Sequence, residues 1–159
     1  MRVKIIGVGK VKEKYLQEGM KEYLKRLQPY ARVEIIEVPD EKIPEGASPG
    51  EEERVKKKEG EKVLKKLDPG AYTVVLALEG TPFSSEEWAW HLEKLTREGQ
   101  SNINFIIGGT LGLSPEVKKK GDLLLSFSPL TFPHQLMRLI LLEQIYRSFK
   151  IIRGEPYHR

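Results

Sequence analysis

Two short apolar runs, AYTVVLALEG (71–80) and NINFIIGG (102–109), do not alternate between apolar and polar positions as a half-exposed strand would. Runs of this length are typical of strands that are covered on both faces of a parallel sheet. Helical patterns separate them from three further strand patterns. Strands that alternate with helices predict an α/β fold with a mostly parallel sheet flanked by helices. The further strands are RVKIIGVG (2–9), ARVEIIEVPD (31–40) and DLLLSFS (122–128).

The helical patterns between these strands have recognisable ends. The first helix ends near Leu27, before Pro29. The second, EEERVKKKEGEKVLKKLDPG (51–70), has leading acids and trailing lysines, which suits the helix dipole. Its few apolar residues favour a solvated surface helix, and the alternative is a basic face for RNA phosphates. The next helices begin at Ser84 or Ser85 and, as a short helix, at Ser114.

The last helix, from about Pro133 to Ile152, is apolar over most of its circumference. A helix that covers a sheet needs a single apolar stripe, whereas one that is apolar nearly all round must be buried on two sides. In a small domain, a second copy of the chain most easily supplies the other side. The pattern therefore predicts a homodimer with this helix in the interface.

Length and composition narrow the class of protein. A chain of 159 residues has the length of one domain, 1–159. It has no cysteine, which excludes disulfides and thiolate metal sites. No apolar run would span a bilayer and the start has no signal-peptide pattern, so we expect a cytoplasmic protein without a membrane partner. The net charge of +4 permits a polyanionic partner.

Several common catalytic and cofactor motifs are missing. GVGKVK (7–12) lacks the third glycine of the dinucleotide fingerprint, because Lys12 stands in its place. No segment matches a Walker A loop or a nucleophile elbow. His91, His134 and His158 are scattered without the spacing of a metal pair, so we expect no metal site.

Three loops that follow predicted strands remain as a candidate site. In open α/β sheets, ligands bind beyond the carboxyl ends of the strands, and glycine lets a ligand approach the backbone closely. These loops carry few charges and no phosphate-binding lysine. They therefore favour an adenosine-like ligand over a triphosphate, although ordinary turn chemistry is the alternative for any single loop. The loops are Leu76–Gly80, Ile107–Gly112 and Phe127–Phe132.

Three segments, FIIGGTLGLSPEV (105–117), LSFSPLTFPHQLMRLILLEQIYRSFKII (125–152) and PYHR (156–159), resemble the SPOUT class of methyltransferases. The similarity is closest to its smallest branch, the RlmH family of ribosomal large subunit pseudouridine N3-methyltransferases, and extends over essentially the whole chain. The resemblance implies a C-terminal trefoil knot, an obligate homodimer and S-adenosylmethionine (SAM) as methyl donor. It also implies a pseudouridine of 23S rRNA in the assembled 70S ribosome as the substrate.

The resemblance assigns cofactor contacts to matching positions. Several relatives have Pro-Glu or a similar polar pair at the positions of Thr110 and Leu111. This chain has no acidic side chain there, so no role for one is carried over. Two alternatives stay open from the sequence: a SAM-binding RNA- or ribosome-associated factor, and an enzyme of the same fold that acts on tRNA. The implied cofactor contacts are Leu76, Gly108, Phe127, Ser128, Pro129, Leu130, Thr131 and Phe132.

The terminal segment GEPYHR (154–159) is either a frayed end or an anchored tail that completes the site. N3 loses a proton when it is methylated, and no cofactor loop offers an obvious base. His158 titrates in the range that suits a proton acceptor, Arg159 would neutralise charge on the base carbonyls or grip a phosphate, and Tyr157 would stack on the base. These three are the catalytic candidates, in their own subunit or across to the partner.

The sequence also suggests supporting roles near the tail. Arg138 and Arg153, which flank the last helix, are secondary candidates for RNA contact. Gly154 and Pro156 would turn the tail back over the pocket.

Overall fold

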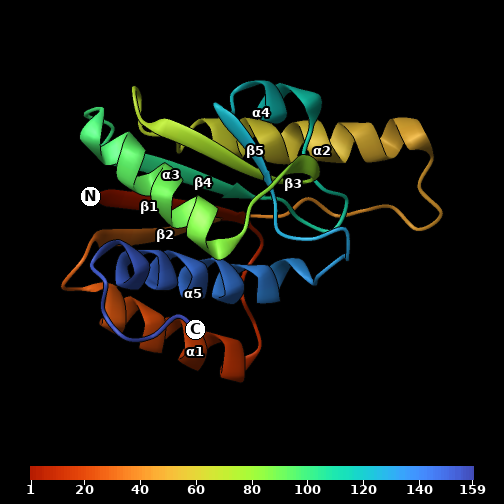
Figure 1. The fold of residues 1–159 in the computed structure, drawn as a ribbon. Coiled ribbons are helices and arrows are strands. Elements are labelled where there is room, and N and C mark those ends of the chain that lie inside the picture. The colour runs from red at the N-terminus through yellow and green to blue at the C-terminus, as the bar shows by residue number, and fades with distance from the viewer.

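The computed structural model describes all 159 residues and contains one five-stranded sheet with helices on both faces (Figure 1). The strand order is β2-β1-β4-β3-β5, and every neighbouring pair is parallel. The α/β prediction is therefore confirmed, with a sheet that is wholly parallel. The strands are β1 (Arg2–Val8), β2 (Arg32–Val38), β3 (Tyr72–Pro82), β4 (Asn102–Ile107) and β5 (Leu123–Ser126), and the helices are α1 (Lys14–Leu27), α2 (Pro49–Leu64), α3 (Ser85–Arg97), α4 (Pro115–Lys119) and α5 (His134–Ile152).

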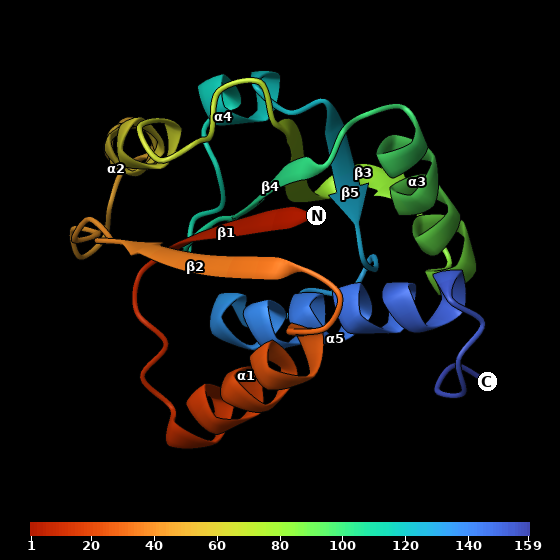
Figure 2. The ribbon, with the colours of Figure 1, turned by 90° about the vertical axis from the view of Figure 1, so that its left-hand side faces the viewer.

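The sheet separates two apolar cores. Figure 2 shows α1, α3 and α5 on one side of the sheet and α2 and α4 on the other. Successive residues of a strand point to opposite faces, so Ile5 belongs to the larger core with α1, α3 and α5, and Ile6 to the smaller core with α2 and α4. This is why the strands at the centre of the sheet are apolar at consecutive positions.

Three helices begin at serine N-caps. Ser48 and Ser84 each form a capping box with a glutamate three residues later, and the Ser114 side chain accepts a hydrogen bond from the backbone N–H of Val117. Ser84, and not Ser85, is therefore the cap of α3. Each cap sets the residue at which a loop ends and its helix begins, and this holds for loops around the candidate site as well.

Helix α5 lies against the sheet between α1 and α3, and the same chain covers much of its surface (Figure 2). Leu141, Leu142 and Ile145 are fully buried in this way. Helices α1 and α3 therefore supply part of the cover that we expected from a second copy, and the homodimer stays a prediction. Half-buried apolar side chains persist in the first half of the helix, among them Leu136 and Ile140. None of the helices, α5 included, combines the length and the apolar character that a membrane span requires.

Arg138 lies in the interior, which corrects its expected role in RNA contact. The side chain is fully buried, with Nη1 donating to Glu37 Oε2 at 2.9 Å and Nη2 donating to the carbonyl of Val8 at 2.7 Å. It passes directly over Gly7, where a Cβ would lie only 2.6 Å from its Cζ. Arg138 thus ties α5 to β1 and β2, and the charge is paired as burial requires. Arg153, by contrast, is exposed.

Candidate active site

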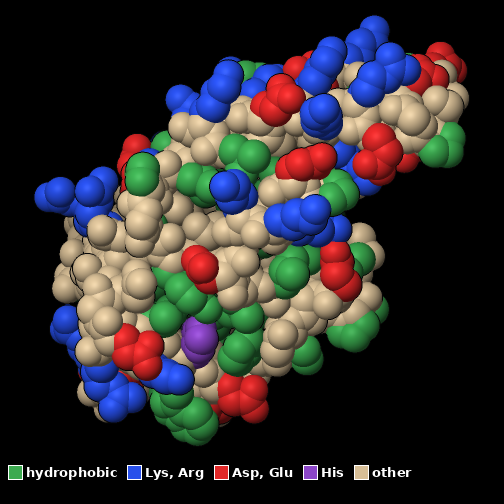
Figure 3. All heavy atoms as spheres, turned by 90° about the horizontal axis from the view of Figure 1, so that it is seen from above, with side chains coloured by type: hydrophobic (Ala, Val, Ile, Leu, Met, Phe, Trp, Pro, Cys, Tyr) green, Lys and Arg blue, Asp and Glu red, His purple; other side chains and the backbone are tan.

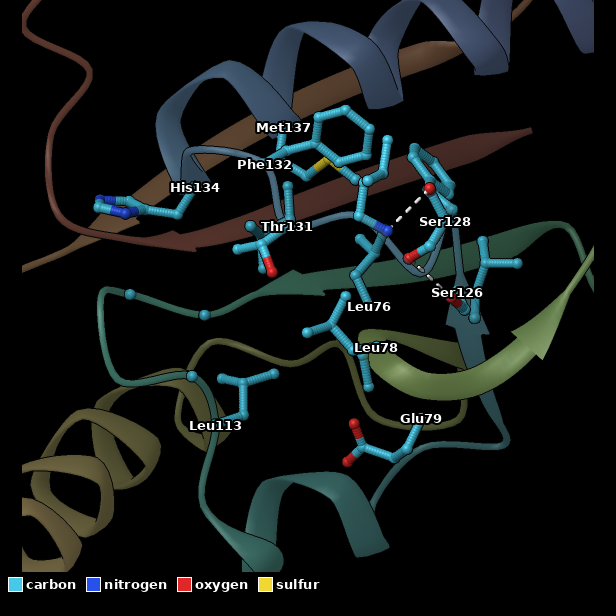
Figure 4. Close-up of a pocket in the computed structure, with 18 of the residues that line it drawn as sticks. Leu76, Leu78, Glu79, Leu113, Ser126, Ser128, Thr131, Phe132, His134 and Met137 are labelled. Atoms are coloured by element: carbon cyan, nitrogen blue, oxygen red, sulfur yellow. Dashed lines mark hydrogen bonds between the residues drawn. The ribbon is translucent and has the colours of Figure 1, made fainter.

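The three predicted loops meet at the carboxyl ends of the strands and enclose a cavity of about 330 Å³ (Figure 4). This volume lies at the lower end of the range for small-molecule sites. The first segment differs from the expectation, because β3 continues to Pro82 and Leu76–Gly80 is not a strand end. The pairing of β3 with β5 instead shifts register between Leu76 and Thr81. This irregularity in the strand directs Leu76, Leu78 and Glu79 to the cavity.

The second segment is a tight glycine loop after β4. Its ends approach each other at Gly109 and Gly112, where the N–H of Gly112 donates to the carbonyl of Gly109 at 3.1 Å. Gly112 has φ +86°, a conformation that favours glycine. A Cβ on Gly108 would lie 2.9 Å from the Leu113 side chain. Crowding therefore excludes a side chain at Gly108 and the backbone conformation disfavours one at Gly112, so the loop presents its backbone to the cavity.

The third segment runs from the end of β5 into α5. Ser126 Oγ donates to the carbonyl of Ser128 at 3.4 Å, and Ser128 Oγ accepts from the N–H of Leu130 at 3.0 Å (Figure 4). In this turn, side-chain hydrogen bonds have the stabilising role that backbone hydrogen bonds have in a helix or strand. Thr131 and Phe132 follow along the cavity wall before α5 begins.

Charge at the cavity is balanced. Glu79 and Lys118 are the acid and the lysine among the lining residues, and Lys118 Nζ lies 2.6 Å from Glu79 Oε1. The hydrogen bond from Lys118 lowers the pKa of Glu79, so the carboxylate stays ionised beside its partner. The three loops themselves carry no lysine, as expected, and Lys118 comes from α4. The pair leaves a site without net charge and with mostly apolar walls.

His134 and Met137 line the same cavity from the first turn of α5, and the sequence analysis did not assign either to the site. Burial, and then the nearby charge of Arg138, lower the pKa of His134. Its imidazole is therefore neutral at physiological pH and is able to accept a proton. The available signal was its position, two residues after Phe132 at the end of the third loop.

The predicted cofactor contacts fall along this one cavity with one exception. Pro129 does not line it. The positions that do are Leu76, Gly108, Phe127, Ser128, Leu130, Thr131 and Phe132.

The C-terminal tail is anchored by its own chain. The Tyr157 ring packs edge-on against Tyr146, with centroids 4.8 Å apart, and its hydroxyl donates to Glu143 Oε1 at 3.2 Å. His158 Nδ1 lies 3.1 Å from a guanidinium nitrogen of Arg147, and Nε2 contacts Glu86 of α3. Because arginine can only donate, Nδ1 accepts and Nε2 carries the proton that bonds Glu86. Of the two readings of the terminus, the structure matches the anchored one.

The tail does not cover the cavity of its own chain. Gly154, with φ +65°, reverses the chain as expected, but the tail then runs back along α5 to Glu143 and Arg147. None of the catalytic candidates Tyr157, His158 and Arg159 lines the cavity. Of the two alternatives for the tail, the one in which it covers the pocket of its own subunit does not match the structure, and the one in which it reaches across to a partner stays a prediction.

Comparison with known proteins adds independent information. Residues 1–158 match a family model described as a predicted SPOUT methyltransferase. The chain is 58% identical over 159 residues to the ribosomal RNA large subunit methyltransferase H of Carboxydothermus hydrogenoformans and 59% identical over 159 residues to that of Alkaliphilus oremlandii, with 100% of each chain covered.

Among solved structures, a probable methylase family protein from Haemophilus influenzae Rd KW20 matches with a TM-score of 0.53 and 11% identity, over 99% of this chain and 70% of that one. At this identity the match concerns the fold alone.

Proposed function

The chain belongs to the SPOUT methyltransferase family as a large-subunit ribosomal RNA methyltransferase, and we propose that it transfers a methyl group from SAM to N3 of a pseudouridine in 23S rRNA of the assembled ribosome. Family membership brings with it the knotted α/β fold. We propose that one domain, residues 1–159, carries the activity and that the enzyme works in the cytoplasm, where its substrate is.

The cavity formed by three loops is the observation that carries this proposal. Its mostly apolar walls fit an adenosyl group, and the glycine loop leaves backbone groups free to bind polar edges. Bound SAM supplies an electrophilic methyl group on a sulfonium. Leu76, Phe127 and Met137 would pack against the donor, while Glu79 stays paired with Lys118 and adds no net charge beside it.

Removal of the N3 proton needs an acceptor near the cavity. His134 is a candidate that lines the cavity and is neutral at physiological pH. His158 belongs to the tail, which lies away from the cavity of its own chain. For His158 and Arg159 to act on the base, the tail must reach the site of a second copy. We therefore place the tail's catalytic role across a homodimer, with positioning of the base as its main contribution.

The proposed dimer would use the first half of α5. Leu136 and Ile140 are half-buried there although they are large and apolar, and α5 enters this half directly from the cavity wall. A second copy packed on this surface would cover apolar area beside the site, which favours association. Its tail would then lie close to the cavity that it is proposed to complete.

A methyl-transfer assay on 70S ribosomes from a strain that lacks the gene tests the proposal. Mass mapping of 23S rRNA and of tRNA after the reaction should locate the new methyl group on N3 of one pseudouridine in 23S rRNA. Methylation of tRNA, or SAM binding by calorimetry without any transfer, would contradict the proposal. Each of these outcomes points to one of the two alternatives left open by the sequence.

Paired glycine variants link that activity to the cavity. Gly108→Val should abolish SAM binding, because even a Cβ at this position would lie 2.9 Å from Leu113. Gly50→Ala is the matched control, since the nearest heavy atom to its Cβ would be 4.0 Å away. Retained SAM affinity in the Gly108 variant would place the donor elsewhere.

A further inference from the structure

Helices α2 and α4 present exposed basic side chains that have no acidic partner. The three lysines of this region that do form ion pairs are Lys56 with Glu53, Lys62 with Glu41, and Lys118 with Glu79. Figure 3 shows Lys and Arg side chains gathered along the edge of the molecule that α2 forms. The exposed basic residues outside any ion pair, here called the basic surface, are Arg54, Lys57, Lys58, Lys65, Lys66, Lys119 and Lys120.

The basic surface is organised by the helical repeat. Arg54, Lys57, Lys58 and Lys65 recur at intervals of three, four and seven residues and so share one face of α2. Val55 and Val63 on the opposite face are buried, and Val63 belongs to the smaller core against the sheet. One exposed acid, Glu61, lies within this basic stripe. The result is a row of positive charge on the solvent side of one straight element.

The basic surface is held at a fixed place beside the cavity. Gly60 of α2 packs so tightly on α4 that a Cβ there would lie 2.7 Å from Ser114 Oγ and 2.9 Å from Val117. The adjacent residue, Glu59, lies beside the glycine loop, with Oε1 3.5 Å from where a Cβ on Gly109 would stand. Lys118 of α4 itself lines the cavity. Helix α4 therefore joins the cavity wall to the basic helix α2.

The N-terminal half of α2 also extends past the sheet. Figure 1 shows this end of the helix, with the loop before it, beyond the carboxyl ends of the strands and on the side where the cavity loops lie. If the target base of an RNA enters the cavity, the nucleotides next to that base would lie beside this end of the helix. Arg54 lies on this half of α2, and Lys57 and Lys58 follow immediately after its midpoint.

We infer that the basic surface of α2 and α4 binds the phosphate backbone of the rRNA that flanks the target base. The inference rests on the proposed function and adds to it the surface by which the ribosome is held. Phosphate contacts by lysine and arginine position a nucleic acid without reading its sequence, which suits a row of flexible side chains on a rigid helix. Such contacts act on ribosome affinity and leave the chemistry at the cavity unchanged.

Charge reversal on α2 tests the inference. The triple variant Arg54→Glu, Lys57→Glu, Lys58→Glu changes exposed residues only. We expect its KM for 70S ribosomes to rise about ten-fold or more, and the slope of log affinity against log salt to become shallower by up to about three, one for each lost phosphate contact. The kcat at saturating ribosomes, the SAM affinity and the melting temperature should stay at wild-type values.

A matched variant on the opposite side of the sheet provides the control. Lys14→Glu, Lys21→Glu, Lys25→Glu on α1 makes the same change in net charge at exposed positions. Its KM should stay within about two-fold of wild type, since long-range attraction alone is screened at physiological salt. Equal effects in the two variants, or an unchanged KM in the α2 variant, would overturn the inference while leaving methyl transfer intact. A wild-type protein that cannot methylate ribosomes would instead refute the proposed function, and this inference with it.

Discussion

At the scale of single residues, Glu59 makes stability depend on pH in an unusual direction. Its side chain is 5% exposed, and Oε2 accepts the N–H of Glu41 at 2.9 Å. Loss of solvation raises its pKa in the folded state. The protonated form is thus favoured by folding, so this contribution is complete below the unfolded-state pKa and is lost as pH rises through the folded-state pKa.

Glu59→Gln keeps a hydrogen-bond acceptor and removes the buried charge. We expect a higher melting temperature than wild type at neutral pH, with the difference shrinking as the pH falls towards 4. Thermal unfolding between pH 4 and 8 measures this, and Glu61→Gln on the exposed side of the same helix is the control. A difference that does not vary with pH would show that Glu59 is not the group responsible.

The buried Arg138 side chain leaves no room for a side chain at Gly7. In Gly7→Ala, the new methyl group would lie 2.6 Å from the guanidinium, which is held by Glu37 and Val8 and has no solvent to move into. We expect a loss of about 1–3 kcal/mol in the free energy of unfolding, as for other overpacked cores. Urea denaturation with Gly50→Ala as the open-space control measures it. An unchanged midpoint for Gly7→Ala would mean that Arg138 is free to move.

At the scale of elements, α3 and the tail are joined through Glu86 and His158. Glu86→Ala removes that link, and we expect faster amide hydrogen exchange for residues 157–159 with little change in global stability, because the pair lies near the surface. If the tail positions the base in a second copy, kcat should fall while SAM affinity is kept. Glu93→Ala, on the same helix and without an ion pair, should change none of these quantities. Unaltered exchange at the tail would assign its anchoring to Tyr157 and to the contact between His158 and Arg147.

The way the elements pack also explains how much of the fold and of the site could be predicted from the sequence. Strands, helices and the Ser84 cap follow from local patterns, and the cavity loops were predictable because the ends of parallel strands converge. The burial of Arg138 and the cover over α5 depend on which helices and strands pack together. A local sequence pattern does not contain that information. His134 and Lys118 reach the cavity from helices. The sequence prediction considered only the loops after strands and therefore did not include them. The tail was identified as chemically unusual, but its path depends on the position of α3.

At the scale of the whole molecule, the placement of the tail makes a prediction about mixed dimers. One subunit carries Gly108→Val, and the other carries both His158→Ala and Arg159→Ala. Neither variant should be active alone. A dimer of the two, isolated with different tags, would contain one complete site and recover about half of the wild-type activity if the tail acts across the interface. No recovery would show that each tail serves its own chain.

The position of β1 inside the sheet has a consequence for how the protein is made. A chain emerging from the ribosome can pair β1 with β2 once Val38 is out, but the other edge of β1 waits for Asn102–Ile107. Throughout that interval an apolar strand edge is open to wrong partners. The nascent protein therefore passes through an aggregation-prone stage during translation, and changes that slow elongation before Asn102 would lower its yield without touching any contact of the finished fold.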